Sequence, residues 1–235
     1  MEHVIRPIAR IRSDLPTKFG VPRQAGLVEE LEAAVIFEPD YRNPDALRGL
    51  EGFSHVWLIW QFSETLREGW SPTVRPPRLG GNARMGVFAT RSPFRPNALG
   101  LSCVRLLRIE KDPALGPVLR VAGADLVDGT PIFDIKPYLP YADCRPEATG
   151  GFAPDAGRTL EVVFAEGVEE RVPADKRAAL RGVLARDPRP RYQNDPGRVY
   201  RLLFAGQEIA FTAEGSQLRV IGAEPVLTND REERT

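Results

Sequence analysis

The chemistry that the sequence suggests first is anion binding, because arginine is concentrated in one stretch. Between residues 69 and 109 the chain carries seven arginines and no lysine, aspartate or glutamate. Planar guanidinium groups pair with phosphate and stack on nucleobases. The alternative is a solvated face in an arginine-rich protein, and composition alone leaves both interpretations open. The candidate RNA-binding residues of this stretch are Arg75, Arg78, Arg84 and Arg95.

Carboxylates gather in a second stretch further along the chain. The run Asp125-Leu-Val-Asp-Gly-Thr-Pro ends a predicted strand. Asp128-Gly129 is typical of a tight turn capped by Thr130, although the same loop could present carboxylates and backbone groups to a small ligand. Asp134 follows between apolar residues, where a carboxylate needs a partner such as Lys136 or an arginine of the acid-free stretch.

Several common catalytic and metal-binding patterns are missing from the sequence. His55 lies in a predicted buried strand and His3 is the only other histidine, so no metal site and no His-based dyad is predicted. Cys103 and Cys144 lack CxxC spacing, which argues against a zinc cage and favours a reducing compartment. Walker-A and GxGxxG motifs are absent, which argues against ATP, GTP or a Rossmann-bound cofactor.

The bulk composition limits the class of protein. The chain has 235 residues, 42% hydrophobic and 27% charged, which is an ordinary globular balance. Lys+Arg and Asp+Glu both number 32, so attraction to nucleic acid must come from local patches. No stretch approaches the ~20 apolar residues of a membrane span, and the N-terminus has no signal-peptide pattern. We expect a soluble, cytoplasmic protein with no membrane partner.

Strands and turns dominate the first 140 residues. The aromatic and apolar segment FSHVWLIWQF at 53–62 predicts a buried central strand. Because no regular helices separate the predicted strands, we expect a mainly β fold built on an antiparallel β-barrel rather than a doubly wound sheet. The other strands are predicted at 4–11, 33–37, 85–90, 99–110 and 117–125.

The remainder of the chain predicts a smaller α+β unit. Residues 145–158 are rich in Gly, Ala and Pro and resemble a linker. A strand is expected at 158–164 and a helix at 174–186, which must end before Asp187-Pro188. Glycine-containing turns then predict a three-strand meander over 199–204, 208–212 and 217–221.

These patterns divide the chain into three parts. We expect a barrel domain at 1–145, a small α+β domain at 155–226 and a disordered tail at 227–235.

Four ordered motifs give the sequence a resemblance to a known family. They are VPRQAG, GLEGFSHVWLIWQF, RPPRLGGNARMGVFATRSPFRPNALGLS and DLVDGTPIFDIKPYLPYAD, and they cover nearly all of residues 1–143. A further motif, DPRPRY at 187–192, lies in the C-terminal part. The sequence closely resembles the TrmO family, also called TsaA-like or VirR/YaeB.

The resemblance implies a fold, an activity and partners. Members are S-adenosylmethionine-dependent tRNA methyltransferases that modify N6 of N6-threonylcarbamoyladenosine at position 37, beside the anticodon. They bind the cofactor on a β-barrel that is unrelated to the Rossmann fold, and they typically form homodimers. We therefore expect S-adenosylmethionine as cofactor, the tRNA anticodon loop as partner and a homodimer.

The resemblance also implies which residues form the cofactor site. Ser63 and Glu64 stand where bacterial members often carry a His-Gln-like pair, so the sequence departs from the family there. The expected cofactor-binding residues are Pro22, Arg23, Gln24, Ser63, Glu64, Arg91, Leu101, Asp125, Val127, Asp128, Gly129 and Thr130.

Methyl transfer to a ureido nitrogen requires alignment of the reactants and loss of a proton. We expect Asp128 or Asp134 to accept that proton. The threonyl carboxylate of the substrate is an anion that Arg91 or Arg95 could bind, which makes Arg95 the third catalytic candidate. The target base must leave its stack in the loop to reach the site.

A second basic cluster lies in the C-terminal part. Arg189, Arg191 and Tyr192 are predicted to contact the tRNA, and the alternative is a proline-stiffened loop after a helix. Deleting residues 150–235 is expected to weaken tRNA binding and to leave cofactor binding largely intact.

Two other functions remain open at this point. The barrel could bind RNA without using a methyl donor, or it could transfer a methyl group from the same cofactor to another substrate. Titration with S-adenosylmethionine separates a binding module from an enzyme, and nucleoside analysis identifies the substrate.

Overall fold

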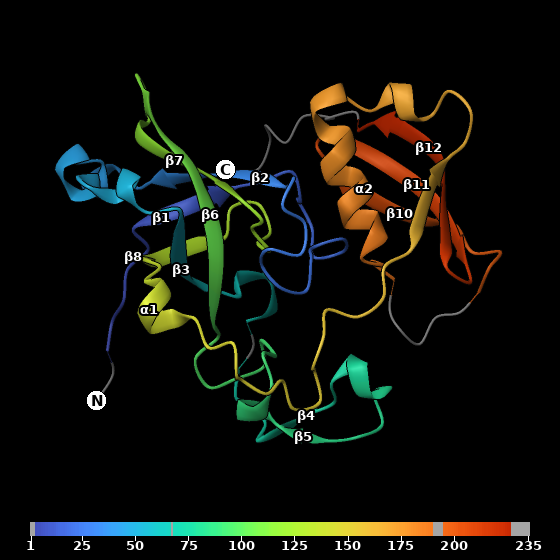
Figure 1. The fold of residues 1–235 in the computed structure, drawn as a ribbon, viewed down its shortest axis with the longest axis horizontal. Coiled ribbons are helices and arrows are strands. Elements are labelled where there is room, and N and C mark those ends of the chain that lie inside the picture. Colours follow the sequence, from blue (N-terminus) through green and yellow to red (C-terminus); the bar gives the residue numbers. More distant parts are fainter. Residues whose placement is uncertain (1–2, 67, 190–194, 227–235) are drawn as a thin grey trace.

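Six strands of the N-terminal part form one sheet that closes on itself (Figure 1). The computed structural model describes residues 3–66, 68–189 and 195–226. The sheet runs in the order β1-β2-β7-β6-β3-β8, with β1 pairing with both β2 and β8, and all its pairs are antiparallel. The mainly β prediction is confirmed. The strands are β1 (Ala9–Arg12), β2 (Glu32–Phe37), β3 (His55–Gln61), β6 (Leu99–Asp112), β7 (Gly116–Ala122) and β8 (Pro131–Pro137).

Strict alternation along β3 explains how this closed barrel fills its interior. Val56, Leu58 and Trp60 point inward and are at most 7% exposed. The intervening residues, Trp57 and Ile59 among them, are only half-buried on the outer face. The sequence prediction of a strand here was right, but its apolar character on both faces does not mean that both faces are buried.

The strand predicted at 85–90 is confirmed only for its first two residues. Only β5 (Met85–Gly86) is extended, and it pairs with β4 (Thr73–Val74) in a two-stranded excursion below the barrel (Figure 1). The chain then turns through the 3-10 segment Val87–Ala89, which the Thr90 hydroxyl closes by donating to the Val87 carbonyl at 2.8 Å. Val87 is 1% exposed and anchors the turn, so the next side chain, Phe88, faces solvent.

The C-terminal part contains a four-stranded sheet in the order β10-β11-β12-β9. The predicted meander and helix are confirmed, and the helix ends before Asp187. In the sheet β9 pairs with β12 in parallel, whereas the other pairs are antiparallel. These elements are β9 (Glu161–Phe164), α2 (Arg177–Ala185), β10 (Tyr200–Phe204), β11 (Gln207–Glu214) and β12 (Gln217–Pro225).

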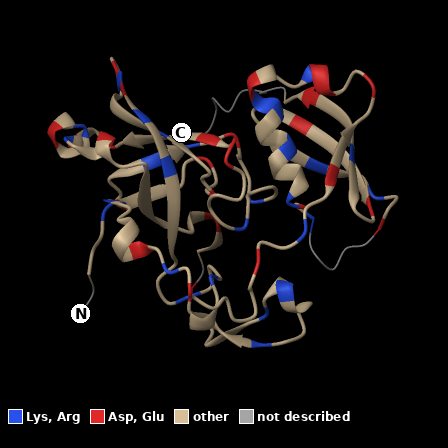
Figure 2. Cartoon of the chain, viewed as in Figure 1, with Lys and Arg blue, Asp and Glu red and all other residues tan. Residues whose placement is uncertain are grey.

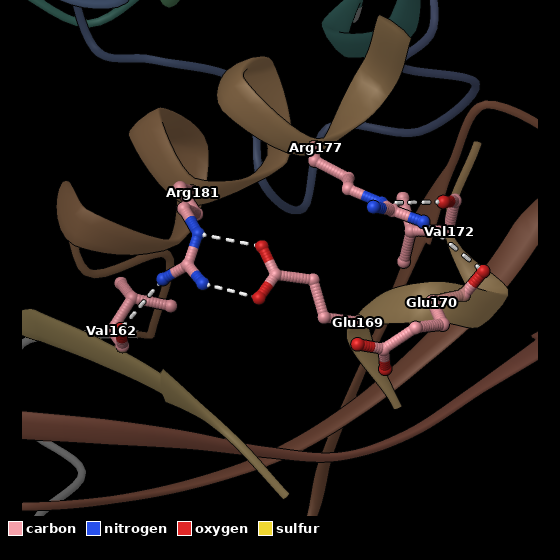
Figure 3. A network of polar contacts seen from close by, with 6 residues as sticks. All are labelled: Val162, Glu169, Glu170, Val172, Arg177 and Arg181. Atoms are coloured by element: carbon pink, nitrogen blue, oxygen red, sulfur yellow. Dashed lines mark hydrogen bonds and ion pairs between the residues drawn. The ribbon is translucent and has the colours of Figure 1, made fainter. Parts of the chain in front are cut away.

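Arginines of α2 tie that helix to its neighbours (Figure 3). Arg181 donates two hydrogen bonds to the carboxylate of Glu169, at 3.0 and 2.6 Å, and a third to the Val162 carbonyl at 3.0 Å. Arg177 donates to the carbonyls of Val172 and Glu170. Both guanidinium groups therefore stabilise the domain rather than extend from its surface.

The loop between β1 and β2 packs into the core of the C-terminal sheet. Leu15, Val28 and Leu31 are at most 2% exposed and belong to the same apolar cluster as Leu202. Gly20 lies so close that a Cβ built on it would be 2.2 Å from Leu202 Cδ1. This loop, expected to belong to the barrel domain alone, thus joins the two parts of the chain.

Polar contacts reinforce the same junction. Lys176 Nζ lies 2.7 Å from Asp14 Oδ2, and Arg186 Nε donates to the Leu27 carbonyl at 3.1 Å. The chain leaves the barrel through α1 (Pro140–Asp143), and the linker that follows passes beside the β4–β5 excursion before it reaches β9 (Figure 1). In the described part of the chain no helix has the length and apolar character needed to cross a membrane.

Candidate functional site

A cleft of about 1440 Å³ opens where three segments meet: the β1–β2 loop, the arginine-rich excursion and the C-terminal domain. Figure 2 shows the basic residues of the excursion beside this junction. Among the described residues that line the cleft, eight are Lys or Arg and only two, Asp155 and Asp187, are acidic. Each of these carboxylates is already paired with an arginine. The cleft therefore favours an anionic ligand.

Arg91 and Gln24 meet in the cleft although 67 positions separate them in the chain. The Arg91 guanidinium donates to the Gln24 amide oxygen, and the Gln24 amide nitrogen donates to the Arg23 carbonyl. Two backbone bonds hold this loop against the end of β7: Gly26 donates to the Gly123 carbonyl at 2.8 Å, and Gly123 donates to the Leu31 carbonyl at 2.9 Å. The predicted residues Pro22, Arg23, Gln24 and Arg91 are thus brought together.

Asp125 lies behind this group and ends a chain of hydrogen bonds that crosses the barrel interior. The Trp60 indole donates to the Ser102 hydroxyl at 2.9 Å, and that hydroxyl donates to Asp125 Oδ1 at 2.5 Å. Gly100 makes room for the indole, because a Cβ there would lie 2.3 Å from the Trp60 ring. Burial raises the pKa of the Asp125 carboxyl, whereas Ser102 and the nearby Arg91 oppose that shift.

This environment gives Asp125 a defined effect on stability. The pKa of Asp125 in the folded state lies above its ordinary value of 3.8. The contribution of Asp125 to the free energy of unfolding is therefore fully present below pH 3.8, and it is lost as the pH rises through the raised pKa. We expect Asp125→Asn to remove this loss. The difference in unfolding free energy between wild type and variant, measured by urea denaturation across pH, should shift in favour of the variant as pH rises. A difference that does not change with pH would contradict the assignment.

The arginines of the excursion fall into two groups. Arg75 and Arg84 are exposed and line the cleft. Arg78 donates to the Asp155 carbonyl at 2.6 Å and pairs with its carboxylate at 3.4 Å, so it holds the linker to the cleft. Arg95 donates to the carbonyls of Thr90 and Ser92 and thereby braces its own loop. Arg75 and Arg84 are therefore the exposed arginines of the excursion that could pair with a ligand in the cleft.

Asp128 occupies a turn on another side of the barrel. Its carboxylate accepts a hydrogen bond from the Ser13 amide at 2.9 Å, and with Gly129 it lines a separate hollow of about 230 Å³. The Thr130 hydroxyl donates to the Val127 carbonyl at 2.7 Å, which confirms the predicted capped turn. These turn residues do not line the large cleft.

The other predicted site residues on the barrel also lie outside the cleft lining. Asp134 pairs with Lys136 at 2.9 Å, one of the two kinds of partner predicted for it. Leu101 points outward from β6 and is 55% exposed. Ser63 begins a 3-10 turn after β3, and the neighbouring Glu64 carbonyl accepts a bond from Lys18, which does line the cleft. The structure therefore gives neither Asp128 nor Asp134 a place beside Arg91.

Arg189 is committed to internal contacts and is not available to RNA phosphates. Its side chain is 6% exposed, it forms two hydrogen bonds with the Asp187 carboxylate, and it donates to the Ala213 carbonyl. Burial of a guanidinium requires such a partner, and the sequence motif could not distinguish this role from RNA contact. Arg191, Tyr192 and the tail at 227–235 lie outside the described residues.

Sequence reasoning missed several residues that the fold brings to the cleft. Lys18, Phe88, Phe94 and Asp155 all line it. Phe88 could have been identified as an aromatic residue within the acid-free stretch, but the sequence pattern assigned it to a strand. In the part of the chain that is described, no group of three or more His, Cys, Asp or Glu side chains forms a metal site.

Comparison with known families gives two matches that together cover most of the chain. Residues 10–144 match the tRNA-methyltransferase O N-terminal domain, and residues 157–226 match the TrmO C-terminal domain.

Individual proteins are similar over nearly the full length. The chain is 43% identical over 229 residues to a tRNA (adenine(37)-N6)-methyltransferase of Escherichia coli, which covers 93% of this chain and 96% of that protein. It is 41% identical to a putative S-adenosylmethionine-dependent methyltransferase of Pseudomonas aeruginosa, over 85% and 88% of the two chains. A crystal structure of TrmO from Pseudomonas aeruginosa superposes with a TM-score of 0.79 at 32% identity, covering 95% and 98%.

Proposed function

Because the chain belongs to the TrmO family, we propose that it is a tRNA methyltransferase that transfers a methyl group from S-adenosylmethionine to N6 of N6-threonylcarbamoyladenosine at position 37. The observation that carries the proposal is the predominantly basic cleft in which Arg91 and Gln24 meet, with the half-buried Asp125 close enough to Arg91 for their charges to interact. The names of the relatives support both tRNA and the methyl donor.

The donor set at this point fits S-adenosylmethionine. The cofactor carries a carboxylate, an ammonium and a sulfonium group, so a binding site needs both an anion receptor and an anionic group. In the cleft, Arg91 supplies guanidinium donors and Gln24 supplies an amide. The carboxylate of Asp125, held by Ser102, lies outside the cleft lining but close enough to Arg91 to interact with its charge. When bound, S-adenosylmethionine supplies an electrophilic methyl group on a positively charged sulfur.

The protein contributes orientation and selection of the substrate. Arg91 is held by Gln24, so its guanidinium is already placed before a ligand arrives, which lowers the entropic cost of binding. The exposed Arg75 and Arg84 pair with the RNA backbone or with the threonyl carboxylate of the modified base. Position 37 reaches the cleft after its base leaves the stack in the anticodon loop. Neither Asp128 nor Asp134 lines this cleft, so we assign the proton acceptor to neither.

A homodimer in the cytoplasm completes the proposal. The outer face of β3 and β6 places Ile59 beside Leu101 and Trp57 beside Cys103, and it leaves Leu101 55% exposed. An apolar sheet face of this kind is stabilised by a second subunit. Cys103 and Cys144 are free thiols, as expected in a reducing compartment.

Replacing Leu101 with aspartate is expected to convert the dimer into a monomer. The substitution places a charge on the apolar face, and a buried unpaired charge opposes association strongly. Sedimentation velocity measures the change. Ile221→Asp is the matched control, because Ile221 is 42% exposed on β12 of the other sheet. If the wild type is a monomer, or if both variants sediment alike, the outer face of β3 and β6 is not the dimer interface.

The proposed activity is tested in two steps. Calorimetric titration of the full chain with S-adenosylmethionine should show saturable binding at one site per subunit. Mass spectrometry of tRNA nucleosides from a deletion strain should then show loss of the N6-methylated form of threonylcarbamoyladenosine, restored by the wild-type gene. RNA binding without cofactor binding would support a non-catalytic RNA-binding barrel instead, and cofactor binding with unchanged tRNA would indicate another substrate.

A further inference from the structure

An exposed aromatic pair stands at the edge of the cleft. The rings of Trp70 and Phe88 are stacked, with centroids 6.2 Å apart and an interplanar angle of 28°. Trp70 is 51% exposed and Phe88 is 73% exposed. Large aromatic side chains are seldom left so open on a surface unless a ligand or partner covers them.

The local fold builds this exposure into the structure. The strands β4 and β5 hold the two segments together, and the Val87 amide donates to the Pro72 carbonyl at 2.9 Å. Val87 is buried beneath the turn, so Phe88 cannot rotate inward without removing that anchor. Trp70 and Phe88 thus come from two segments that lie side by side, one before β4 and one after β5, and the backbone bonds between these segments bring the two rings together.

The charges around the pair indicate its ligand. Phe88 lines the cleft together with Phe94 and the guanidinium groups of Arg75, Arg84 and Arg91. From residue 69 to residue 109 the chain carries no acid, and Asp155, which lines the cleft with Phe88, is paired with Arg78, so the cleft beside the rings attracts phosphate. Flat aromatic faces beside a cationic track are the arrangement by which proteins hold unpaired nucleobases.

We propose that Trp70 and Phe88 form a stacking platform for an unpaired base of the anticodon loop next to the base that is methylated. The inference rests on the proposed function, since it takes tRNA as the substrate, and it adds a binding site for a neighbouring nucleotide. The arginines bind the backbone, and the platform binds the base plane through its π face. Because stacking accepts any base, the platform contributes affinity and placement rather than base identity.

Binding of an anticodon stem-loop RNA tests the platform. Phe88→Ala and Trp70→Ala should each raise the dissociation constant about 10-fold, measured by fluorescence anisotropy. Phe88→Tyr, which retains an aromatic face, should bind like wild type. Tyr41→Ala is the control, because Tyr41 is 38% exposed yet lies outside the cleft lining, and it should leave affinity unchanged. Circular dichroism checks that each variant is folded.

A direct optical readout identifies the contact itself. A 2-aminopurine placed beside position 37 should be quenched when the RNA binds wild type and should remain bright with Phe88→Ala. The wild type must first be shown to bind the RNA. If Phe88→Ala then has the same affinity and the same quenching as Tyr41→Ala, the platform is overturned. Altered sedimentation of the two aromatic variants with unchanged RNA affinity would instead assign the pair to a protein interface. If wild type binds no RNA at all, the proposed function itself fails.

Discussion

Replacing Arg91 with alanine is expected to weaken S-adenosylmethionine binding about 100-fold. A hydrogen bond to a charged group contributes about 1.5–3 kcal/mol, and each 1.4 kcal/mol changes an affinity tenfold. Arg91 is exposed in the cleft and already oriented by Gln24. The substitution should therefore lower the affinity for the cofactor and leave the stability of the fold nearly unchanged. Calorimetric titration gives the affinity, and urea denaturation should show little change in the free energy of unfolding.

Two further variants separate the charge of Arg91 from its shape. Arg91→Lys retains a positive charge but loses the planar fork, so we expect an intermediate affinity. Arg108→Ala is the matched control from the same acid-free stretch, because Arg108 pairs with Glu110 on the barrel at 2.7 Å. Equal affinities for Arg91→Ala and Arg108→Ala would contradict the placement of the cofactor beside Arg91.

Deleting residues 150–235 is expected to abolish cofactor binding as well as RNA binding. The sequence alone predicted that the barrel would retain the cofactor, but the loop that carries Pro22 to Gln24 packs in the core of the C-terminal sheet. Without that sheet, Leu15, Val28 and Leu31 would lose their apolar surroundings. Titration of the purified barrel fragment with S-adenosylmethionine measures the outcome, and wild-type affinity would show that the loop holds its shape alone.

A single substitution in the full chain tests the same junction. Gly20→Ala should lower the free energy of unfolding by about 3 kcal/mol and weaken cofactor binding, since it meets both a φ of +99° and the buried Leu202 side chain. Gly206→Ala is the matched control, with a φ of +75° but nothing within 4 Å of the added Cβ. The control has the backbone cost without the clash, so equal losses of stability for the two variants would contradict close packing of Gly20 against Leu202.

Local pattern was sufficient to predict most elements of the fold. The long aromatic and apolar run at 53–62 identified β3, and the glycines at 206 and 215 marked the turns of the C-terminal meander. The strand predicted at 85–90 ends after Gly86, because Val87–Ala89 form a 3-10 turn that the Thr90 hydroxyl closes. A six-residue window cannot distinguish these two conformations.

The site was predictable only in part, because its residues come together through long-range packing. The motif positions Pro22, Arg23, Gln24 and Arg91 do meet, yet their spacing in the chain gives no indication of it. Asp128 was a reasonable acid–base candidate from its residue type. Its carboxylate, however, accepts a hydrogen bond from the backbone amide of Ser13, 115 positions away in the chain. Local sequence patterns cannot predict a hydrogen bond between residues that only the tertiary fold brings together.

The packing of the β1–β2 loop also sets an order of events during synthesis. Domains generally fold as the chain leaves the ribosome, from the N-terminus onward. Residues 13–31 leave the ribosome before Leu202 and its neighbours, against which they pack. Until the C-terminal sheet has been made, the loop that carries Pro22 to Gln24 lacks the apolar surface on which it rests. We therefore expect ligand binding to begin only after the C-terminal sheet has been synthesised.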